Sequence, residues 1–440
     1  MFQPKITLKA LAALAAGVLL FACNKENGKK GDDPTPAPTP AGPSLTVAPE
    51  ALNFAFNASD PQTLTVTANV AWESDYEAAW LAPTPTEGSG NATVSVEVAP
   101  NTTLQSRTAT ITFKSGELTA TVTVTQAPDE DAVAAAKLLR QKDSTALMAI
   151  YTASNGATWK DGRVWDLTQP MDKWYGVTVD TTATDLGRVV ELKLSASTVP
   201  TTTAEWTIPA AIGDLTELTT FQIEKSRVTG ALPDELYTLT KLKKLYLNNN
   251  NITGSFSTAL GDLTELEELR ILASANFTGT IPTTIGNLKK LRSISLSQTK
   301  IKGSIPTELA GCTSLQQFMA FQCQLSGELP EIWDQFKNNF SILMLYGNSD
   351  LYGPLPTSLG NITTGAATLS IQLYNCNFEG GIPASFANLP AACKQLFLDG
   401  NCLEGQIPAA VVAHANYNTW KTGNSSHLLF NQQEGYVLYE

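Results

Sequence analysis

The sequence of 440 residues is poor in histidine and in charge, and basic residues are outnumbered by acidic ones. It holds 2 His and 16% charged residues, with a net charge of −12. A surface that binds nucleic acid needs a positive footprint, so a nucleic-acid partner is excluded. The two histidines, His414 and His427, accompany no nucleophile motif, and adjacent acids such as Glu267 and Glu268 do not by themselves make a glycosidase pair. We therefore expect a protein that is not an enzyme.

Cysteine is scarce as well. Five cysteines follow Cys23, and an odd number does not fit a complete disulfide framework. No Cys/His cluster has zinc spacing, so we expect no metal ion and no other cofactor. Cys323 and Cys376 fall in a repeated column described below, where a small buried residue fits. Cys376 and Cys402 lie on adjacent repeats, so a disulfide between these two stays open as an alternative.

Only the N-terminus carries a long apolar run. Lys5 and Lys9 precede twelve mostly apolar residues, Ala10 to Phe21, which are too few to span a bilayer as a helix. Residues 1–22 are therefore predicted to be a signal peptide. No later segment is apolar enough to cross a membrane.

The end of this run, Leu20-Phe21-Ala22-Cys23, resembles the lipobox of bacterial lipoproteins. The resemblance implies a lipid on Cys23 and a lipid-anchored protein at the outer membrane or cell surface, which touches the membrane through that lipid only. The alternative is an ordinary secretory signal with an incidental cysteine. Residues 23–43 are charged and then rich in proline, so we expect an extended, lipidated linker.

Residues 44–128 alternate apolar and polar side chains in short runs rich in Thr and Val, separated by turn residues. This pattern predicts an all-β sandwich in which Trp72 and Trp80 fill the core. The segments LTVAPEALNF, TVTANVAWES, WLAPTP and NTTLQSRTATITF resemble a BACON domain. That family's name records a proposed role in carbohydrate binding. The sequence identifies no exposed aromatic platform, so the two hypotheses for this domain are a spacer, which we favour, and a glycan-binding module.

Residues 129–188 have a different composition. Helical spacing is predicted over Asp131–Asn155, and three tryptophans follow, Trp159, Trp165 and Trp174. A tryptophan cluster beside a helix could form a ligand cage. The stretch resembles the N-terminal caps of plant-type leucine-rich repeats, including the W-Y-G-V before the first repeat, so we favour a cap that covers the first coil.

Residues 189–410 repeat with a period near 24, as in LKKLYLNNNNITGSFSTALGDLTE from Leu242 to Glu265. Nine turns are recognisable. The template L-x-x-L-x-L-x-x-N-x-L-x-G-x-I-P resembles the plant-type leucine-rich repeat. The predicted fold class is thus multi-domain, with an all-β immunoglobulin-like sandwich followed by a right-handed solenoid of short parallel strands and 3-10 or irregular return segments. The solenoid has a helical N-terminal cap, and residues 411–440 form a C-terminal cap.

One column of the repeat is usually Asn, whose amide can bond backbone groups inside the coil. Only three of its nine members are Asn here, so we expect a ladder made partly by smaller side chains. The column contains Ser197, Ser226, Asn250, Ser274, Thr299, Cys323, Asn348, Cys376 and Asn401. Glycines such as Gly279 and prolines such as Pro282 are assigned to the bend and the return segment.

The outward positions of the repeat differ between the two halves of the solenoid. The first half carries charged residues typical of a solvated face. The second half carries a predicted ligand-binding patch on the concave sheet, formed by Met319, Phe321, Met344, Tyr346, Tyr374 and Phe397. Exposed aromatic and Met side chains are typical of interaction surfaces. The alternative is that the C-terminal cap, which holds Trp420, Leu428, Leu429, Phe430, Tyr436 and Tyr439, folds back over this patch.

The leucine-rich repeat resemblance implies recognition of a protein or peptide on the concave face. Two other hypotheses stay open: a glycan- or mucin-binding accessory protein that uses residues 44–128, and a passive envelope component. The sequence does not identify the ligand.

Overall fold

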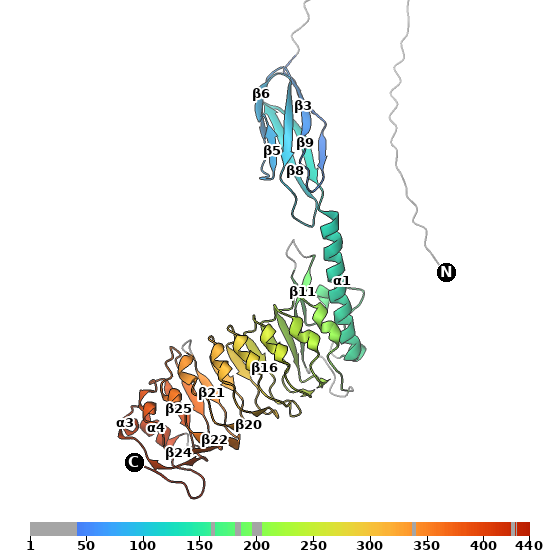
Figure 1. Ribbon diagram of the computed structural model, residues 1–440. Coiled ribbons are helices and arrows are strands. Elements are labelled where there is room, and N and C mark those ends of the chain that lie inside the picture. Colours follow the sequence, from blue (N-terminus) through green and yellow to red (C-terminus); the bar gives the residue numbers. More distant parts are fainter. Residues whose placement is uncertain are drawn as a thin grey trace, which may run out of the picture.

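The computed structural model describes residues 42–440 except 160–162, 181–185, 196–204, 337–339, 424–426 and 428. The predicted signal peptide, Cys23 and nearly all of the linker lie outside the described residues, as do Ser197 of the ladder column and Leu428 of the C-terminal cap. No described helix combines the length and apolar content that a membrane span requires. Figure 1 shows a β-sandwich, a long helix and a curved solenoid in chain order.

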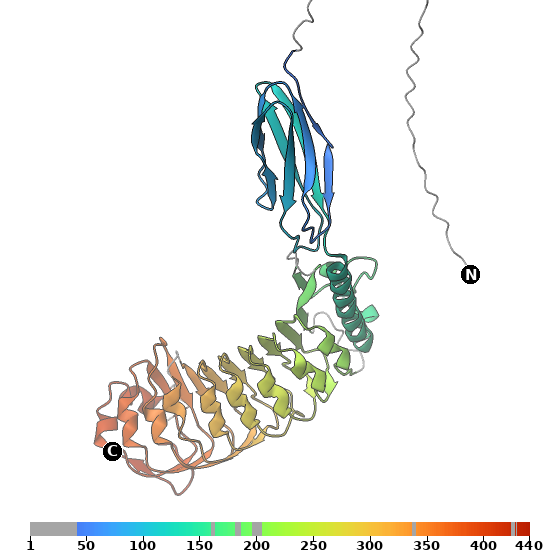
Figure 2. The ribbon, with the colours of Figure 1, turned by 45° about the horizontal axis from the view of Figure 1, so that its top comes forward.

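The first part consists of two facing sheets (Figure 2), with strand orders β1-β3-β7-β5 and β2-β9-β8-β4-β6. Only the β2–β9 pair is parallel. Alternation along each strand sends every second side chain into a shared core that includes Leu64, Val66 and Phe113. The strands are β1 Leu45–Ala48, β2 Ala51–Phe54, β3 Gln62–Ala68, β4 Ala71–Asp75, β5 Leu81–Thr84, β6 Glu87–Ser89, β7 Ala92–Val98, β8 Arg107–Ser115 and β9 Leu118–Gln126.

Helix α1, Glu130–Ala153, follows the sandwich directly, close to the predicted bounds. The Asp129 carboxylate caps it by accepting from the amides of Asp131 and Ala132, and acids in the first turn favour this end of the helix dipole. The buried residues of α1 all lie in its second half. The helix packs against the solenoid at β11 and η3, and Arg140 donates to Gly187 O just before β11.

The three tryptophans after α1 form one packed aromatic group with Tyr151. Trp165 stacks on Trp174 with ring centroids 4.8 Å apart, and on Tyr151 at 5.1 Å, while Trp159 meets both Tyr151 and Trp165 edge-on. All four rings are buried. A ligand cage needs open ring faces, so this alternative is wrong for the described residues. Two short helices, η1 Gly156–Thr158 and η2 Met171–Lys173, lie between the rings in sequence.

A buried ion pair joins α1 to the first coil. The Arg188 guanidinium donates two bonds to the Asp143 carboxylate, at 2.9 and 2.8 Å, and the Val189 amide donates a third at 2.8 Å. Side chains of Arg188 and Asp143 are 4% and 0% exposed. Arg188 also donates to the Thr216 hydroxyl, so the pair has further partners inside the fold.

The solenoid is built on one sheet in which nine strands, β11 to β25, run parallel, in agreement with the nine predicted turns. We number the coils one to nine by these strands. β10 Val177–Asp180 pairs antiparallel with β11. The coil strands are β11 Arg188–Ser195, β12 Thr220–Glu224, β14 Lys244–Tyr246, β16 Glu268–Arg270, β17 Ser293–Ser295, β19 Gln317–Met319, β21 Ile342–Met344, β23 Leu369–Gln372 and β25 Cys393–Phe397.

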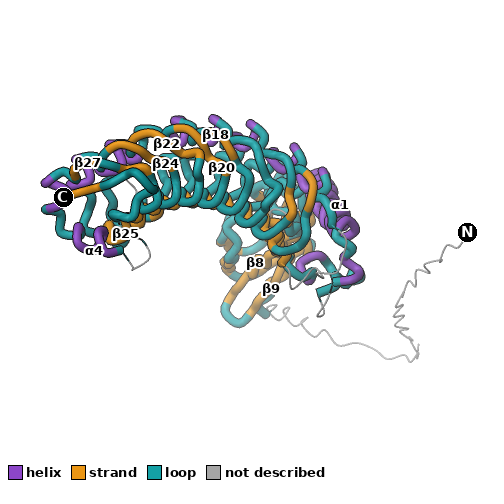
Figure 3. Tube along the Cα trace, turned by 90° about the horizontal axis from the view of Figure 1, so that it is seen from below, coloured by secondary structure: helices purple, strands orange, loops and turns teal. Residues whose placement is uncertain are grey.

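Short strands also form on the opposite side, which Figure 3 shows as the outer curve of the arc. They are β13 Thr229–Gly230, β15 Asn251–Ile252, β18 Lys302–Gly303, β20 Gln324–Gly327, β22 Asp350–Pro354, β24 Asn377–Gly380 and β26 Cys402–Leu403. Gly279 is needed at the bend, since its φ is +81° and a Cβ there would lie 2.3 Å from Ser255 Cβ.

The return segments are single helical turns, most of which begin after a proline, as at Pro282 and η6. Proline suits this place because its fixed φ matches the turn and no backbone donor is lost. They are η3 Ala210–Asp214, η4 Asp234–Thr238, η5 Thr258–Asp262, η6 Thr283–Asn287, η7 Thr307–Gly311, η8 Trp333–Gln335, α2 Thr357–Gly360, η9 Ala384–Asn388 and α3 Ala409–Val412.

The C-terminal segment covers the last coil. Trp420 of α4, Tyr417–Thr422, is buried, and its indole N–H donates to Cys393 O at 2.7 Å. Leu429 is also buried, whereas Tyr436 and Tyr439 are exposed. Strand β28, Leu438–Tyr439, adds to β27, Gly405–Gln406, at the outer edge.

The hydrogen bonds inside the coils differ with the side chain that occupies the ladder column. Asn250 donates to Ile223 O of the previous coil and Leu247 O of its own, and its carbonyl oxygen accepts from the Ser226 and Val228 amides. Asn348 and Asn401 repeat this arrangement. The Cys323 and Cys376 thiols bond carbonyls of the previous coil instead. All five described cysteines are free, so Cys376 and Cys402 form no disulfide.

Asn250→Ala should lower the free energy of unfolding of the solenoid by about 2–3 kcal/mol, because it leaves buried backbone groups on two coils unpaired. The matched control is Ser274→Ala at the equivalent position. The Ser274 hydroxyl is buried without a hydrogen-bond partner, so its loss should cost almost nothing. Urea unfolding followed by circular dichroism measures both, and equal losses would contradict this account of the ladder.

Asp143→Ala should cost about 3–5 kcal/mol of stability, because the Arg188 charge would remain buried without its carboxylate. Tryptophan fluorescence during urea unfolding reports on the neighbouring Trp159–Trp174 group. The control is Asp172→Ala, whose ion pair with Lys173 is solvent-exposed and should leave the free energy of unfolding nearly unchanged. A small effect of Asp143→Ala would show that α1 is held mainly by apolar packing.

Candidate functional site

Three columns of side chains point outward from the concave sheet, because strand pairing fixes the register from coil to coil. We name them by position along the strand. Column A holds Glu191, Thr220, Lys244, Glu268, Ser293, Gln317, Ile342, Ser370 and Gln395. Column B holds Lys193, Gln222, Tyr246, Arg270, Ser295, Met319, Met344, Gln372 and Phe397. Column C holds Ser195, Glu224, Asn248, Leu272, Ser297, Phe321, Tyr346, Tyr374 and Asp399.

The charged groups of coils one to four bond one another. Glu268 accepts from the Tyr246 hydroxyl and from Arg270, both at 2.6 Å, and pairs with Lys244 at 3.5 Å. Arg270 also lies over the Tyr246 ring, 4.8 Å from its centroid. Burial opposes ionisation of Glu268, but these three partners outweigh it and hold its pKa below the ordinary value.

The same neighbours fix the protonation of Tyr246. Burial and the bond to Glu268 raise the pKa of its hydroxyl. One coil earlier, Glu224 accepts from Asn248 and Gln222. The polar groups of this half are therefore largely satisfied within the protein.

Coils five to eight are different, because none of the twelve outward residues in the three columns is charged. Column B here is centred on Met319 and Met344, and column C is aromatic from coil six to coil eight. The outward residues of coil five are three serines, all of them buried. In a chain with a net charge of −12, an uncharged surface of this size stands out from its surroundings.

The aromatic side chains of column C stack along the solenoid axis. Phe321 and Tyr346 lie 4.5 Å apart and Tyr346 and Tyr374 lie 4.3 Å apart, each pair with ring planes within 8° of parallel. Both faces of Tyr346 are thus covered by neighbouring rings, and ring edges and hydroxyls are what the concave side can present. Burial raises the pKa of both tyrosines, that of Tyr374 to about 12, so both hydroxyls stay protonated.

Phe397 is a correction to the predicted patch. It is only 7% exposed, because His427 of the C-terminal segment stacks on it with centroids 4.6 Å apart. His427 also lies 4.2 Å from the Tyr374 ring and binds Asp399 at 3.2 Å. The cap therefore covers the coil-nine end of the patch. Met319, Phe321, Met344, Tyr346 and Tyr374 are half-buried, with part of each surface open to solvent.

Sequence reasoning missed the glutamines of column A. Gln317 accepts from the Ser293 hydroxyl at 3.3 Å, and Gln395 of coil nine accepts from the Ser370 hydroxyl at 2.8 Å. Gln372 differs, because its nitrogen donates to Ser370 at 3.0 Å. A Ser followed by a Gln in the same column one coil later was the sequence signal that could have predicted these bonds.

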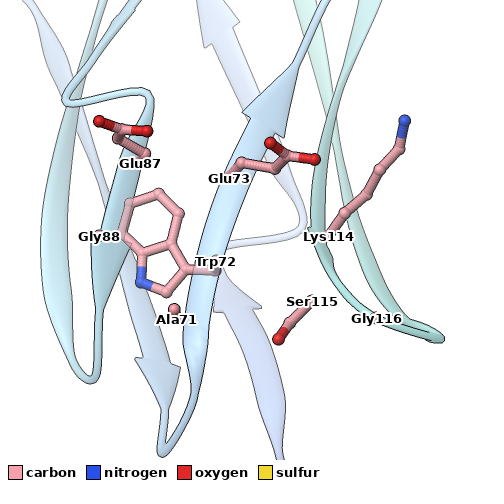
Figure 4. Close-up of a pocket in the computed structure, with 8 residues that line it drawn as sticks. All are labelled: Ala71, Trp72, Glu73, Glu87, Gly88, Lys114, Ser115 and Gly116. Atoms are coloured by element: carbon pink, nitrogen blue, oxygen red, sulfur yellow. The ribbon is translucent and has the colours of Figure 1, made fainter.

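The β-sandwich offers a shallow hollow beside Trp72 (Figure 4). Trp72 itself is buried, and Gly88 admits its ring, since a Cβ at position 88 would lie 2.6 Å from Trp72 Cζ2. The second tryptophan, Trp80, is half-buried with the Arg107 guanidinium 4.5 Å from its ring centroid. Trp72 is therefore closed to solvent, and the Arg107 guanidinium lies over the partly exposed Trp80 ring.

The described residues contain no group of three or more His, Cys, Asp or Glu side chains arranged for a metal ion. Burial raises the pKa of the Cys312, Cys376 and Cys393 thiols to about 12. These thiols are protonated at neutral pH, and a protonated thiol is a poor nucleophile and a poor metal ligand.

Two family models match the chain. The BACON model, described as an N-terminal domain for which binding is proposed, matches residues 70–127. A leucine-rich repeat region model matches residues 163–357. No curated protein matches the chain.

Solved structures show the same solenoid fold. The leucine-rich repeat ectodomain of the Arabidopsis thaliana receptor kinase GASSHO1/SCHENGEN3, in complex with CASPARIAN STRIP INTEGRITY FACTOR 2, is 24% identical over 62% of this chain, with a TM-score of 0.54. A plant ice-binding protein is 20% identical over 68% of this chain and 96% of its own, with a TM-score of 0.50. The chain spans only 31% of the length of the receptor ectodomain.

Glu268→Gln should lower the free energy of unfolding by about 1 kcal/mol at pH 7, because the charge-assisted bonds from Tyr246 and Arg270 are weakened. A carboxylate with a lowered folded pKa contributes stability above its unfolded pKa of 4.5 and loses it as pH falls through the folded value. The difference from the wild type should therefore shrink below pH 4. Thermal unfolding from pH 3 to 8 tests this. Glu267→Gln is the control, because the Glu267 carboxylate pairs only loosely with Arg292, at 4.0 Å, and its loss should change the free energy of unfolding little.

Proposed function

Because this chain contains a BACON domain and a leucine-rich repeat region, we propose that it is a non-catalytic recognition protein. It binds a protein or peptide partner on the concave sheet, at coils six to eight. Met319, Phe321, Met344, Tyr346 and Tyr374 make the contact. Phe397 supports this surface from beneath His427 rather than touching the partner.

The observation that carries this proposal is the contrast between the two halves of the sheet. In coils one to four, charged groups such as Glu268 and Arg270 are bonded to each other, and a partner would have to break those bonds. In coils six to eight, apolar and aromatic surface is open in part, and none of the outward residues carries a charge that would have to be desolvated. Removing such surface from water stabilises a complex by roughly 25 cal/mol per Å².

Ring stacking favours a peptide over a sugar on this surface. Sugars usually pack on an open aromatic face, and the faces of Tyr346 are occupied by Phe321 and Tyr374. Ring edges carry partial positive charge and suit the carbonyl oxygens of a peptide backbone. The GASSHO1/SCHENGEN3 ectodomain, whose structure holds a factor named as its complex partner, is consistent with this choice.

We propose further that Cys23 is lipidated and anchors the chain at the outer membrane or cell surface. The support is the Leu20-Phe21-Ala22-Cys23 ending after an apolar run. Residues 23–43 would then tether an immunoglobulin-like sandwich that acts as a spacer, since Trp72 is buried and Arg107 lies over the Trp80 ring in the described structure. The α1 helix with its tryptophan group serves as the N-terminal cap, because it covers the first coil.

Tyr346→Ala and Tyr374→Ala together should abolish capture of a partner by the lipid-free chain from host or bacterial lysate. Each loses a stacked ring worth about 0.5–1.5 kcal/mol, so a modest fall in melting temperature is expected and should be measured alongside. Tyr246→Ala, on the same sheet in the charged half, is the control and should retain capture. Binding that survives the double variant would contradict the proposed surface.

Glycan binding by the sandwich is tested separately. A glycan array probed with the full chain should give no signal that depends on Trp72 or Trp80. A signal lost in Trp80→Ala but kept in the double tyrosine variant would replace the spacer role with a carbohydrate-binding role.

A further inference from the structure

We propose that two copies of the chain associate through α1, with their helices packed antiparallel along a seam formed by Asp131, Ala135, Leu138 and Lys142. This surface is separate from the concave sheet, so the inference goes beyond the proposed function and does not depend on it. It comes from three features of the helix: an apolar face that stays exposed, the spacing of the residues on that face, and the charges at its two ends.

The first half of α1 carries apolar side chains that stay exposed to solvent. Leu138 and Leu139 are 57% and 40% exposed, although both lie in a regular helix beside the first coil. The buried residues of α1 begin only at Asp143, and the turns before it lead from the β-sandwich toward the solenoid (Figure 1). Exposed apolar side chains that lie together usually mark an interaction surface.

The spacing of the exposed residues matches the seam of a coiled coil. Asp131, Ala135, Leu138 and Lys142 follow one another at intervals of four, three and four residues, and all four are exposed. At 3.6 residues per turn, they lie within about 60° of one another around the helix axis. The buried residues of α1 occupy a different face, about 120° away, so a second helix can pack on the seam without displacing the solenoid.

Antiparallel packing places every residue of the seam opposite a complementary residue of the second copy. When Ala135 lies opposite Leu138, Asp131 lies opposite Lys142, because both pairs share one midpoint along the helix. The two-fold axis repeats each pair, so one interface holds two Ala–Leu contacts and two Asp–Lys pairs. Each leucine faces a small residue, and this lets the helix axes approach to about 8 Å.

The charges at the ends of the seam favour a second copy, in antiparallel orientation, as the occupant. Asp131 and Lys142 have no residue of opposite charge three or four positions away on α1, where a helical ion pair would form. A parallel dimer would bring the two Asp131 carboxylates together and the two Lys142 ammonium groups together, and like charges along a seam repel. The antiparallel dimer pairs both charges and covers Leu138 at the same time.

Sedimentation velocity of the lipid-free chain over a concentration series tests the inference. We expect a reversible monomer–dimer equilibrium with a dissociation constant on the order of 100 μM, because the seam is far smaller than a standard interface of about 1,600 Å². Leu138→Gln should weaken the dimer about tenfold and leave the melting temperature of the monomer unchanged, since Leu138 is exposed there. A wild-type chain that stays monomeric at about 1 mM would overturn the inference.

Charge reversal tests the antiparallel register. Asp131→Lys and Lys142→Asp should each weaken the dimer about tenfold, because each variant alone brings like charges together at both ends of the interface. An equimolar mixture of the two variants should associate as tightly as the wild type, since each position 131 then faces an opposite charge at position 142. Single variants that dimerise like the wild type, or a mixture that fails to associate, would overturn the inference.

Matched controls exclude an effect of charge on the helix itself. Glu130→Lys makes the same charge change as Asp131→Lys in the first turn of α1, and Lys137→Asp makes the same change as Lys142→Asp. Both residues are exposed and lie off the seam, so both variants should dimerise like the wild type. Control variants that weaken the dimer as much as the seam variants would overturn the inference.

A final comparison separates this interface from the proposed ligand surface. Tyr346→Ala together with Tyr374→Ala should leave the dimer intact, and Leu138→Gln should still capture a partner from lysate. Self-association that is lost in the double tyrosine variant but kept in Leu138→Gln would place the second copy on the concave sheet and overturn the inference. Failure to capture a lysate partner, with the α1 dimer intact, would refute the proposed function alone.

Discussion

Parallel backbone hydrogen bonding between coils is the constraint on which the whole solenoid depends. The Leu247 amide donates to Arg270 O, the Ile271 amide to Ser295 O and the Leu296 amide to Met319 O, and similar bonds continue to the last coil. Since each coil is held in fixed register with the next, one position of the repeat becomes one column in space. Inside the coil, the columns form a core of leucines and a polar ladder. Outside, they form the surface that we propose binds a ligand.

The polar ladder shows how far this arrangement tolerates substitution. An Asn at the column bonds backbone groups on two coils, as Asn250 does, whereas Cys376 bonds only carbonyls and the Ser274 hydroxyl bonds nothing. Smaller residues are accepted because the strands on either side still pair. The residue after column C is left-handed in coils two to nine, including Asn249 and Gln298, and this directs the chain from the sheet to the ladder.

Both ends of the solenoid have to be covered, because an open coil exposes apolar side chains and unpaired strand edges. Different segments of the chain cover the two ends. At the N-terminal end, α1 and the Trp165 group cover the core, and the Asp143–Arg188 pair fixes the helix. At the C-terminal end, Trp420 covers the core while His427 reaches the concave face and covers Phe397. This second cap therefore also sets where the proposed ligand surface ends, at Tyr374.

The repeat template by itself determined the nine coils, the column that each residue occupies and the aromatic character of the second half, because a fixed period fixes inside and outside. The tryptophan sequence likewise predicted a covered end. Only the tertiary structure decided which of those residues are available. The stacking of Phe321, Tyr346 and Tyr374 depends on side-chain rotamers that neighbours on other coils set. The burial of Phe397 depends on His427, which lies in the C-terminal segment. Contacts between such distant segments have no local pattern, so sequence periodicity could not reveal them.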